Sequence, residues 1–379
     1  MKLYSKEERY WIWLNKMLGS GYARFHNIAQ EYGGPEGVFD AAKCGKLTIK
    51  SPLNEGNVRF IQKNASEGFI DDYLEGLNNS GIGVTTPISE DYPYLLSEIY
   101  DPPTVLFYRG TVKRELTLPI AVIGARKCTE YGRRVAFTLS RQLSDQGVCV
   151  ISGLAYGIDG ESSRGALASI KSDYPTVAVL GTGVDVVYPN QNRPIYDAIV
   201  ERGAVVSEFA PGTQAIPGNF PRRNRVISGL SKGIVVVEAR EKSGTLITVN
   251  HALDQGRDIF SVPGRITDAS CRGTNNLIRR AMAKPVFGIN DILEEYGISL
   301  SDKPDARPSR DIRQTLDGER AVIYDLLKDG DKTFDELCES MSIEAGALNT
   351  ILTELEFSRI IIQTPGTVSY THLRAHETP

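Results

Sequence analysis

Three arginines, one phenylalanine and two asparagines lie within the stretch Pro217–Leu230 of this 379-residue chain. A guanidinium group pairs with phosphate through a planar fork of donors, and an aromatic face can stack on an unpaired base. The apolar residues that end the stretch predict a short helix, so the arginines are expected at a loop-to-helix junction, where free backbone N–H groups also attract anions. Alone, the stretch indicates either an anion site or a solvated turn rich in arginine. Its candidate residues are Asn219, Phe220, Arg222, Arg223 and Arg225.

The middle of the chain, residues 82–297, alternates short β-branched runs with amphipathic stretches. This pattern is typical of an α/β fold with a Rossmann-like, doubly wound parallel sheet, in which ligands bind beyond the carboxyl ends of the strands. Four loops with small or cationic residues fall at those ends, and together with the arginines they predict an extended anion-binding rim. Their candidate residues are Arg126, Lys127, Ser152, Gly153, Gly181, Lys242, Ser243, Gly244 and Thr245.

The sequence lacks the residues that several common kinds of functional site require. Neither G-x-G-x-x-G nor G-x-x-x-x-G-K-[ST] occurs, which disfavours a dinucleotide dehydrogenase and a P-loop ATPase. The five cysteines are scattered without a C-x-x-C pair and there are four histidines, so we expect no disulfide framework, metal or cofactor. The acidic residues of the middle region are expected to cap helices or pair with arginines, although they would also provide acid–base pairs. They are Asp159, Glu161, Asp185, Glu208 and Glu238.

The overall charge and hydropathy restrict the class of protein. A net charge of −4 excludes a globally basic nucleic-acid binder, so any phosphate affinity must come from a local patch. No apolar run approaches the roughly 20 residues that a membrane span requires. The first ten residues lack the apolar core of a signal peptide. We therefore expect a cytoplasmic protein that does not contact the membrane.

Residues 1–80 are predicted to be helical. An apolar stripe from Trp11 to Leu18 ends at Gly19–Gly21, and a second helix follows it. Helix, glycine turn and helix in this order resemble a helix-hairpin-helix or SAM-like domain, whose turn can hold DNA phosphate. The same turn also serves as a plain cap in small helical bundles.

Beyond a predicted linker at residues 298–313, residues 314–368 are expected to form a winged helix of three helices and a hairpin. Thr333 and Glu336 predict a capping box at the start of the second helix. From Asp317 to Val368, eleven acidic residues stand against four basic ones, a net charge of −7 that repels a phosphate backbone. A protein-binding or structural role is therefore favoured over transcription regulation through DNA. Residues 369–379 resemble a translated adapter and are expected to be a non-native tail.

Several long motifs agree with one family in order and spacing. The motifs are A-V-I-G-A-R at 121–126, I-S-G-L-A at 151–155, A-V-L-G-T-G at 178–183, the arginine stretch, and S-G-T-L-I-T at 243–248. The chain therefore resembles the DNA-processing protein A family (DprA, also called Smf) over nearly its whole length. The resemblance implies a non-enzymatic, single-stranded DNA-binding recombination mediator. Such a protein dimerises through its Rossmann-like domain, protects incoming DNA during natural transformation and loads the RecA recombinase.

The resemblance also implies that nine of the candidates line a strand-binding groove. They are Arg126, Ser152, Gly153, Asn219, Phe220, Arg222, Arg223, Arg225 and Lys242. Two positions depart from the family pattern: Tyr156 stands where an arginine is common, and Ser163 where a histidine is common. The tyrosine removes one phosphate partner but can stack on a base.

The competing hypothesis is a related Rossmann-like hydrolase of nucleoside monophosphates, which uses a P-G-G-x-G-T-x-x-E loop. The corresponding region of this chain, Glu238–Thr245, lacks both the Pro-Gly-Gly entry and the glutamate after Gly-Thr. Hydrolysis is therefore disfavoured by the sequence.

Overall fold

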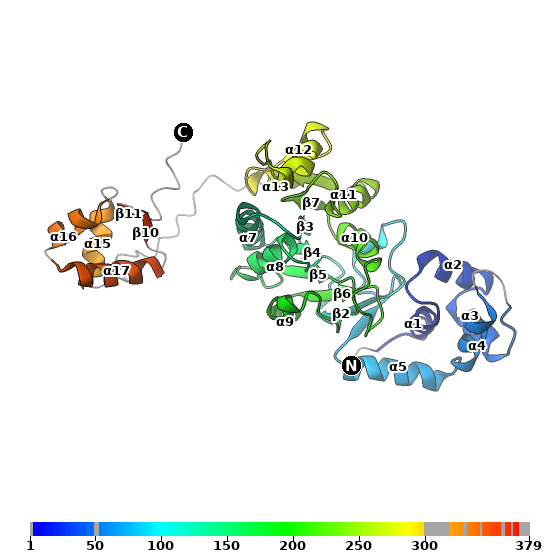
Figure 1. Cartoon of the computed structure of the whole chain (residues 1–379). Coiled ribbons are helices and arrows are strands. Elements are labelled where there is room, and N and C mark those ends of the chain that lie inside the picture. Colours follow the sequence, from blue (N-terminus) through cyan, green and yellow to red (C-terminus); the bar gives the residue numbers. More distant parts are fainter. Residues whose placement is uncertain are drawn as a thin grey trace. The chain divides into compact units, whose positions relative to one another are not determined.

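The computed structural model describes residues 3–48, 53–298, 318–328, 332–341, 343–357, 361–364 and 367–370. The chain divides into two compact units, Met1–Ser299 and Leu300–Pro379 (Figure 1). Apart from Ile298, the predicted linker lies outside the described residues, as does the predicted tail beyond Tyr370.

Within the described residues, five helices precede the sheet of the first unit. The first begins with a capping box, in which the Ser5 hydroxyl accepts from the Glu8 amide at 3.2 Å and the Glu8 carboxylate accepts from the Ser5 amide at 2.7 Å. It ends at Gly19, whose φ of 76° is easily reached by glycine. The helices are α1 (Lys6–Leu18), α2 (Tyr22–Glu31), α3 (Pro35–Lys43), α4 (Glu55–Lys63) and α5 (Glu67–Asn79).

These helices share a hydrophobic core with one edge of the sheet. Buried rings such as Phe25 pack in the same cluster as Phe107 of the sheet. The indole of Trp11 donates to the Thr104 carbonyl at 2.6 Å, and the Asn15 amide donates to the Thr104 hydroxyl at 2.7 Å. The helical region and the sheet are thus joined by a continuous core within one compact unit.

The sheet of the first unit has nine strands in the described residues, in the order β1-β2-β6-β5-β4-β3-β7-β8-β9. All neighbouring strands from β6 to β9 are parallel, as predicted. The edge differs from the prediction because β2 pairs antiparallel with both β6 and β1. The strands are β1 (Gly83–Thr85), β2 (Leu106–Gly110), β3 (Ile120–Ile123), β4 (Val150–Ser152), β5 (Thr176–Val179), β6 (Ala204–Ser207), β7 (Gly233–Val236), β8 (Asp258–Ser261) and β9 (Lys284–Pro285).

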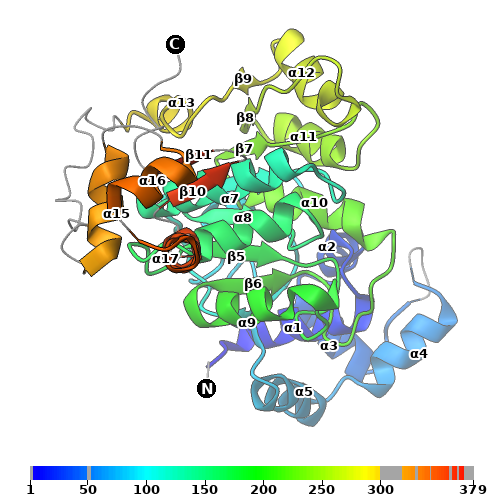
Figure 2. The same ribbon diagram turned by 60° about the vertical axis from the view of Figure 1, so that its left-hand side comes forward.

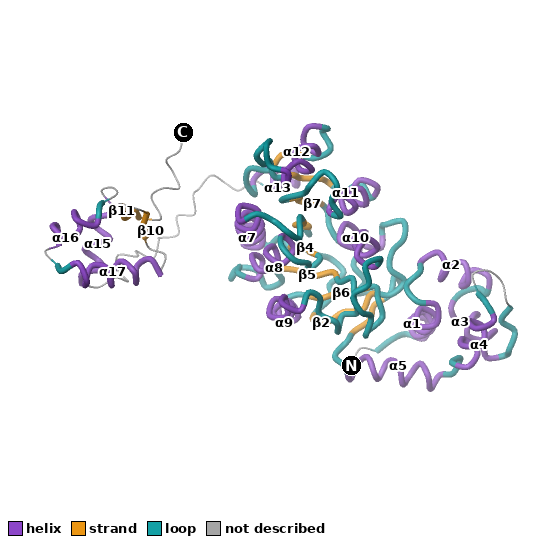
Figure 3. Tube along the Cα trace, in the orientation of Figure 1, coloured by secondary structure: helices purple, strands orange, loops and turns teal. Residues whose placement is uncertain are grey.

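Helices cover both faces of this sheet. Helices α7, α8 and α9 lie on one side of it, and α10 and α11 on the other (Figures 1 and 3). Successive residues of β5 serve the two faces: Val177 shares a core cluster with Val226 of α10, and Ala178 shares one with Ile199 of α9. The apolar strands are therefore buried on both faces, as predicted.

The remaining helices of the first unit connect the strands or follow them. Strands β8 and β9 and helix α12 lie at one end of the sheet, and the N-terminal helices lie at the other (Figure 2). The helices are α6 (Tyr94–Ser97), α7 (Glu130–Asp145), α8 (Ile158–Leu167), α9 (Arg193–Arg202), α10 (Asn219–Gly229), α11 (Thr245–Asp254), α12 (Arg272–Arg279) and α13 (Asn290–Leu293), with 3₁₀ turns at Asn190–Asn192, Ala269–Cys271 and Glu294–Tyr296.

The chain reverses its direction across the sheet between β3 and β7. From β3 it proceeds through β4 and β5 to β6, and it later adds β7, β8 and β9 on the opposite side of β3. Ile123 pairs with Val236, so β3 and β7 end at the same level. The Ala125 amide donates to the Glu238 carbonyl at 2.8 Å and ties the two following loops together. Ligands of doubly wound sheets bind at such a switch point.

The second unit contains three helices and a hairpin in its described residues, as expected of a winged helix. The capping box is confirmed, because Glu336 accepts from the Thr333 amide at 2.7 Å and donates its own amide to the Thr333 hydroxyl at 3.3 Å. Strand β11 reaches Tyr370 and pairs it with Ile361, so the hairpin overlaps the predicted tail at Ser369 and Tyr370. The elements are α15 (Gly318–Lys328), α16 (Phe334–Met341), α17 (Ala345–Phe357), β10 (Ile361–Thr364) and β11 (Thr367–Tyr370).

Candidate nucleic-acid interface

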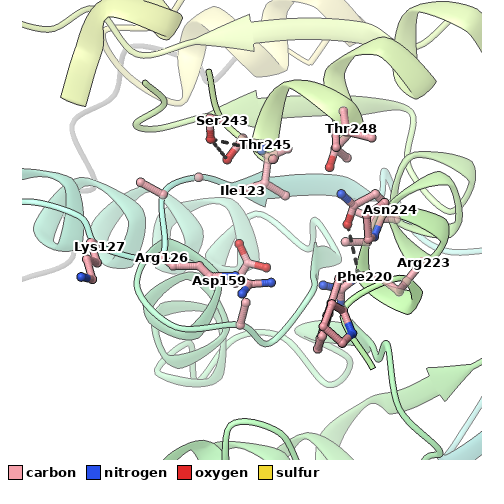
Figure 4. Close-up of a pocket in the computed structure, with 18 of the residues that line it drawn as sticks. Ile123, Arg126, Lys127, Asp159, Phe220, Arg223, Asn224, Ser243, Thr245 and Thr248 are labelled. Carbon is pink, nitrogen blue, oxygen red and sulfur yellow. Dashed lines mark hydrogen bonds between the residues drawn. The ribbon is translucent and has the colours of Figure 1, made fainter. Parts of the chain in front are cut away.

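A cleft of about 710 Å³ opens at the switch point. It is lined by the loops after β3 and β7 and by residues of α10 and α11. Figure 4 shows side chains from these segments around the cleft. The strand-end loops and the arginine stretch therefore meet in one place. The predicted residues in its lining are Arg126, Lys127, Phe220, Arg223, Lys242, Ser243, Gly244 and Thr245.

Four exposed cations belong to the lining of this cleft: Arg126, Lys127, Arg240 and Lys242. None of them forms an ion pair with another residue that the structure describes. The Arg126 guanidinium lies 5.1 Å from the centre of the Phe220 ring. Arg240 was not among the predicted residues, although its position in the loop after β7, beside Lys242, could have indicated it. We refer to these four residues as the cation rim.

Helix α10 begins at Asn219, so the arginines lie in its first turns and not in a preceding loop. One face of the helix lines the cleft, because side chains three and four residues apart share a face. The residues on that face are Phe220, Arg223, Asn224 and Ile227. The neighbouring arginines 222 and 225 consequently point elsewhere.

Arg223 anchors α10 to the end of the sheet. It is only 4% exposed and donates to the Gly153 carbonyl at 2.7 Å and to the Val179 carbonyl. Burial lowers the pKa of Arg223 to about 10, which leaves it charged at neutral pH. A Cβ atom at Gly153 would lie 2.6 Å from both Arg223 and Asp159, so this glycine makes room for the guanidinium.

Arg225 and Arg222 lie outside the lining of this cleft, although the resemblance implies that both line a strand-binding groove. Arg225 is 8% exposed and pairs with Glu208 at 2.7 Å and with Asp101 at 3.0 Å. Arg222 donates to the Ser20 carbonyl, in the glycine turn between α1 and α2. Of the two roles left open for this turn, phosphate contact and plain cap, neither includes this contact, in which the turn accepts a hydrogen bond from an arginine of α10.

Four other predicted residues shape the site without lining the cleft. Ser152 is buried and lies 2.7 Å from the Ser163 hydroxyl, its hydrogen-bond partner. Gly181 leaves space for Phe220, because a Cβ atom there would lie 2.9 Å from the ring. Gly153 accommodates Arg223, and Asn219 is the first residue of α10.

The acidic residues near the cleft are occupied by donors of the protein, as predicted. Asp159 accepts from the Gly153 amide at 3.1 Å; burial raises its pKa, while Arg223 and nearby amides act against that rise. Glu238 accepts from the Thr129 amide at 3.0 Å and from its hydroxyl. Glu161 pairs with Arg164, and Glu208 pairs with Arg225. Asp185 accepts from the Gly212 amide.

The five cysteines are free thiols. Among the residues that the structure describes, no three histidine, cysteine or acidic side chains gather as a metal site would require. The helices in that part of the chain are too short or too polar to span a bilayer.

Two family models match the chain, and together they extend over both units. The model described as DNA recombination-mediator protein A matches residues 83–297, and the DprA winged helix domain matches residues 305–367. The chain belongs to the DNA recombination-mediator protein A family. The family resemblance seen in the motifs is thereby confirmed.

Curated relatives of the DNA recombination-mediator protein A family agree with this assignment. The DNA processing protein DprA of Bacillus subtilis (strain 168) is 40% identical over 227 residues, which are 59% of this chain and 74% of that protein. Protein Smf of Escherichia coli (strain K12) is 36% identical over 291 residues, 76% of each chain.

Two solved structures of DNA processing protein A are similar to this chain. The Streptococcus pneumoniae structure has a TM-score of 0.63 and 32% identity, and it covers 78% of this chain and 99% of that one. A structure concerned with the single-stranded DNA binding mode of the Helicobacter pylori protein has a TM-score of 0.51 and 28% identity, and it covers 56% and 95%. The Rossmann-like fold of the family is therefore that of this chain.

Proposed function

We propose that this chain binds single-stranded DNA in the cleft at the carboxyl ends of β3 and β7. The observation that carries the proposal is the cation rim: four exposed, unpaired cations line one cleft, and one of them, Arg126, lies beside the Phe220 ring. Cations placed along a groove neutralise successive phosphates, and an aromatic face stacks on unpaired bases. The bases of a duplex are already stacked on one another, so this combination favours single strands.

The family supports the same proposal. The Helicobacter pylori relative is described by its single-stranded DNA binding mode, and 95% of its solved chain aligns with this one. We extend the function to recombination mediation in the cytoplasm, in which the bound strand is protected and passed to the RecA recombinase during natural transformation. We assign the acidic winged helix to a protein partner, because its net negative charge opposes DNA.

The proposed function involves no covalent chemistry. The two carboxylates that would serve as an acid–base pair at the switch point, Asp159 and Glu238, both accept hydrogen bonds from within the protein. The hydrolysis of nucleoside monophosphates remains the alternative and requires one of them to be released. Its assay is the liberation of free base.

Fluorescence anisotropy with a labelled single strand and its duplex tests the proposed function. The full chain is expected to bind the single strand at least about tenfold more tightly. Because the cation rim offers four phosphate contacts, the slope of log K against log salt is expected near about −3. Equal or negligible binding to both would contradict the proposal and direct attention to the hydrolase assay.

An exposed apolar groove supports a homodimer through the Rossmann-like region. The groove has a volume of about 350 Å³ and lies between α7 and the segment after β9. Phe287 is 84% exposed beside it, and Tyr131 is 48% exposed. Val135 of α7 is half-buried and lines this groove beside Leu139. An apolar surface of this kind marks a protein interface.

Phe287→Asp is expected to dissociate the dimer. Losing an aromatic anchor costs about 2 kcal/mol or more, which raises the dimer dissociation constant at least about 30-fold. Sedimentation velocity over a concentration series measures this change. The matched control is Ile170→Asp, which places the same charge at another exposed apolar residue (90% exposed). Equal dissociation constants for the two variants would remove this groove from the interface.

A further inference from the structure

Three aromatic rings form a row that begins in the cleft and extends beyond it. The Phe220 ring, on α10, lies 5.6 Å from the ring of Tyr188, in the loop after β5. The Tyr188 ring lies 6.4 Å from that of Tyr156, in the loop after β4. The first two rings line the cleft and the third does not. We call these three residues the aromatic row.

The two tyrosines expose much of their rings. Tyr156 is 38% exposed and Tyr188 is 39% exposed, whereas rings such as Tyr196 are almost fully buried. Neither phenol hydroxyl donates to a residue that the structure describes. Neither full burial nor a hydrogen bond of the hydroxyl therefore explains why these two rings lie at the mouth of the cleft.

The rings use little of their faces on one another. The Tyr156 and Tyr188 planes meet at 79°, edge to face, and those of Tyr188 and Phe220 at 44°. An ordinary aromatic cluster packs its rings for their own stability and is mostly buried. Here one end of the row, Phe220, also carries the Arg126 guanidinium at 5.1 Å. The Arg126 cation thus lies at one end of the row, and the exposed faces of the two tyrosine rings continue from it.

The backbone holds Tyr156 in its place. Gly157, the next residue, has a φ of 73°, and a Cβ atom on it would lie 2.4 Å from the Ala125 carbonyl oxygen. The Ile158 amide donates to that same carbonyl at 3.3 Å. The turn that carries Tyr156 is therefore packed against the loop that carries Arg126.

We propose that the aromatic row is a stacking platform for successive unpaired bases, and that Tyr156 extends base contact beyond the cleft. The proposal rests on single-stranded DNA binding in the cleft, and it extends the stacking already assigned to Phe220 to two further rings. The cations bind phosphates, and their contribution falls with salt. The rings bind base faces, a contribution that tolerates any sequence and depends weakly on salt.

The test compares two labelled single strands of equal phosphate number, one with normal bases and one with abasic sites. For the normal strand, Tyr156→Ala is expected to weaken binding about tenfold with an unchanged salt slope. For the abasic strand, the variant and the unaltered chain are expected to bind equally. Tyr156→Phe, which keeps the ring, is expected to restore affinity for the normal strand.

Two further variants complete the test. Tyr156→Arg exchanges a stacking contact for a phosphate contact, so its salt slope is expected to steepen by about 0.7 and its preference for the normal strand to shrink. Tyr100→Ala removes a tyrosine that is 93% exposed and lies outside the lining of the cleft, and it is expected to change neither value.

The outcomes separate this inference from the proposed function. If the unaltered chain fails to prefer single strands, the proposed function fails. If it binds them and Tyr156→Ala binds the normal strand equally well, or loses affinity for both strands alike, the stacking platform is overturned while the cation rim stands.

Discussion

Arg225→Ala is expected to lower the free energy of unfolding by about 3–5 kcal/mol, because the substitution removes the closer of the two arginines that neutralise the buried Glu208 carboxylate and leaves Arg222 at 3.9 Å. The Arg225 guanidinium lies 2.7 Å from Glu208 and 3.0 Å from Asp101. Glu208 is 3% exposed; burial raises its pKa, and Arg225 and Arg222 act against that rise. With Arg225 removed, Glu208 must either be buried as a charge or take up a proton.

Urea denaturation followed by circular dichroism measures this loss. The control is Arg59→Ala, which breaks a surface pair with Glu55 at 3.1 Å and is expected to cost about 0.5 kcal/mol or less. The folded Arg225 variant is expected to keep the salt slope of DNA binding, since Arg225 does not line the cleft. Two results together would contradict this prediction: a loss of stability no larger than that of Arg59→Ala, and a flatter salt slope of DNA binding. They would indicate that Arg225 contacts DNA.

The second large effect is on DNA binding. The triple variant Arg126→Ala/Lys127→Ala/Lys242→Ala is expected to bind single-stranded DNA about 100-fold more weakly. Each partly solvated charged contact contributes about 1 kcal/mol, and every 1.4 kcal/mol is a factor of about ten. The salt slope is expected to flatten by about 2, because three fewer phosphates are neutralised and each contributes about 0.7 to the slope.

The same anisotropy titration measures affinity and slope for the triple variant. Its matched control, Arg59→Ala/Lys63→Ala/Arg141→Ala, removes the same charge from exposed residues of α4 and α7 outside the lining of the cleft. If the two triple variants lose affinity equally, the effect belongs to net charge and not to the cation rim.

The place of the site was predictable because strand ends are visible in the sequence. Uniform apolar runs revealed β3, β4, β5 and β7, and parallel strands bring their carboxyl ends to one edge of a sheet. Arg126 and Lys242 therefore met where expected. The edge strands β1 (Gly-Val-Thr) and β2 (Leu-Phe-Tyr-Arg-Gly) were missed because glycine and polar residues interrupt them, so neither forms a uniform apolar run.

Which arginines face the cleft was not predictable. The orientation of each side chain on α10 depends on where the helix begins, and Gly218 precedes it without any side-chain cap that would reveal the start. A shift of one residue turns every side chain by about 100°. Arg223 and Arg225, two positions apart, consequently face different partners, and both are buried. The acids that receive Arg225 come from distant segments, and no local pattern predicts that pairing.

The anchoring of α10 bears on the kinetics of binding. Arg223 fastens the helix to the ends of β4 and β5, Arg225 fastens it to Glu208 and Asp101, and Arg222 reaches the turn after α1. Under the proposed function, we therefore expect the α10 side of the cleft to need no ordering before a strand binds. Association is then set by diffusion and electrostatic steering, and slows as salt rises. Differences in affinity between strands are consequently expected in the dissociation rate of each complex.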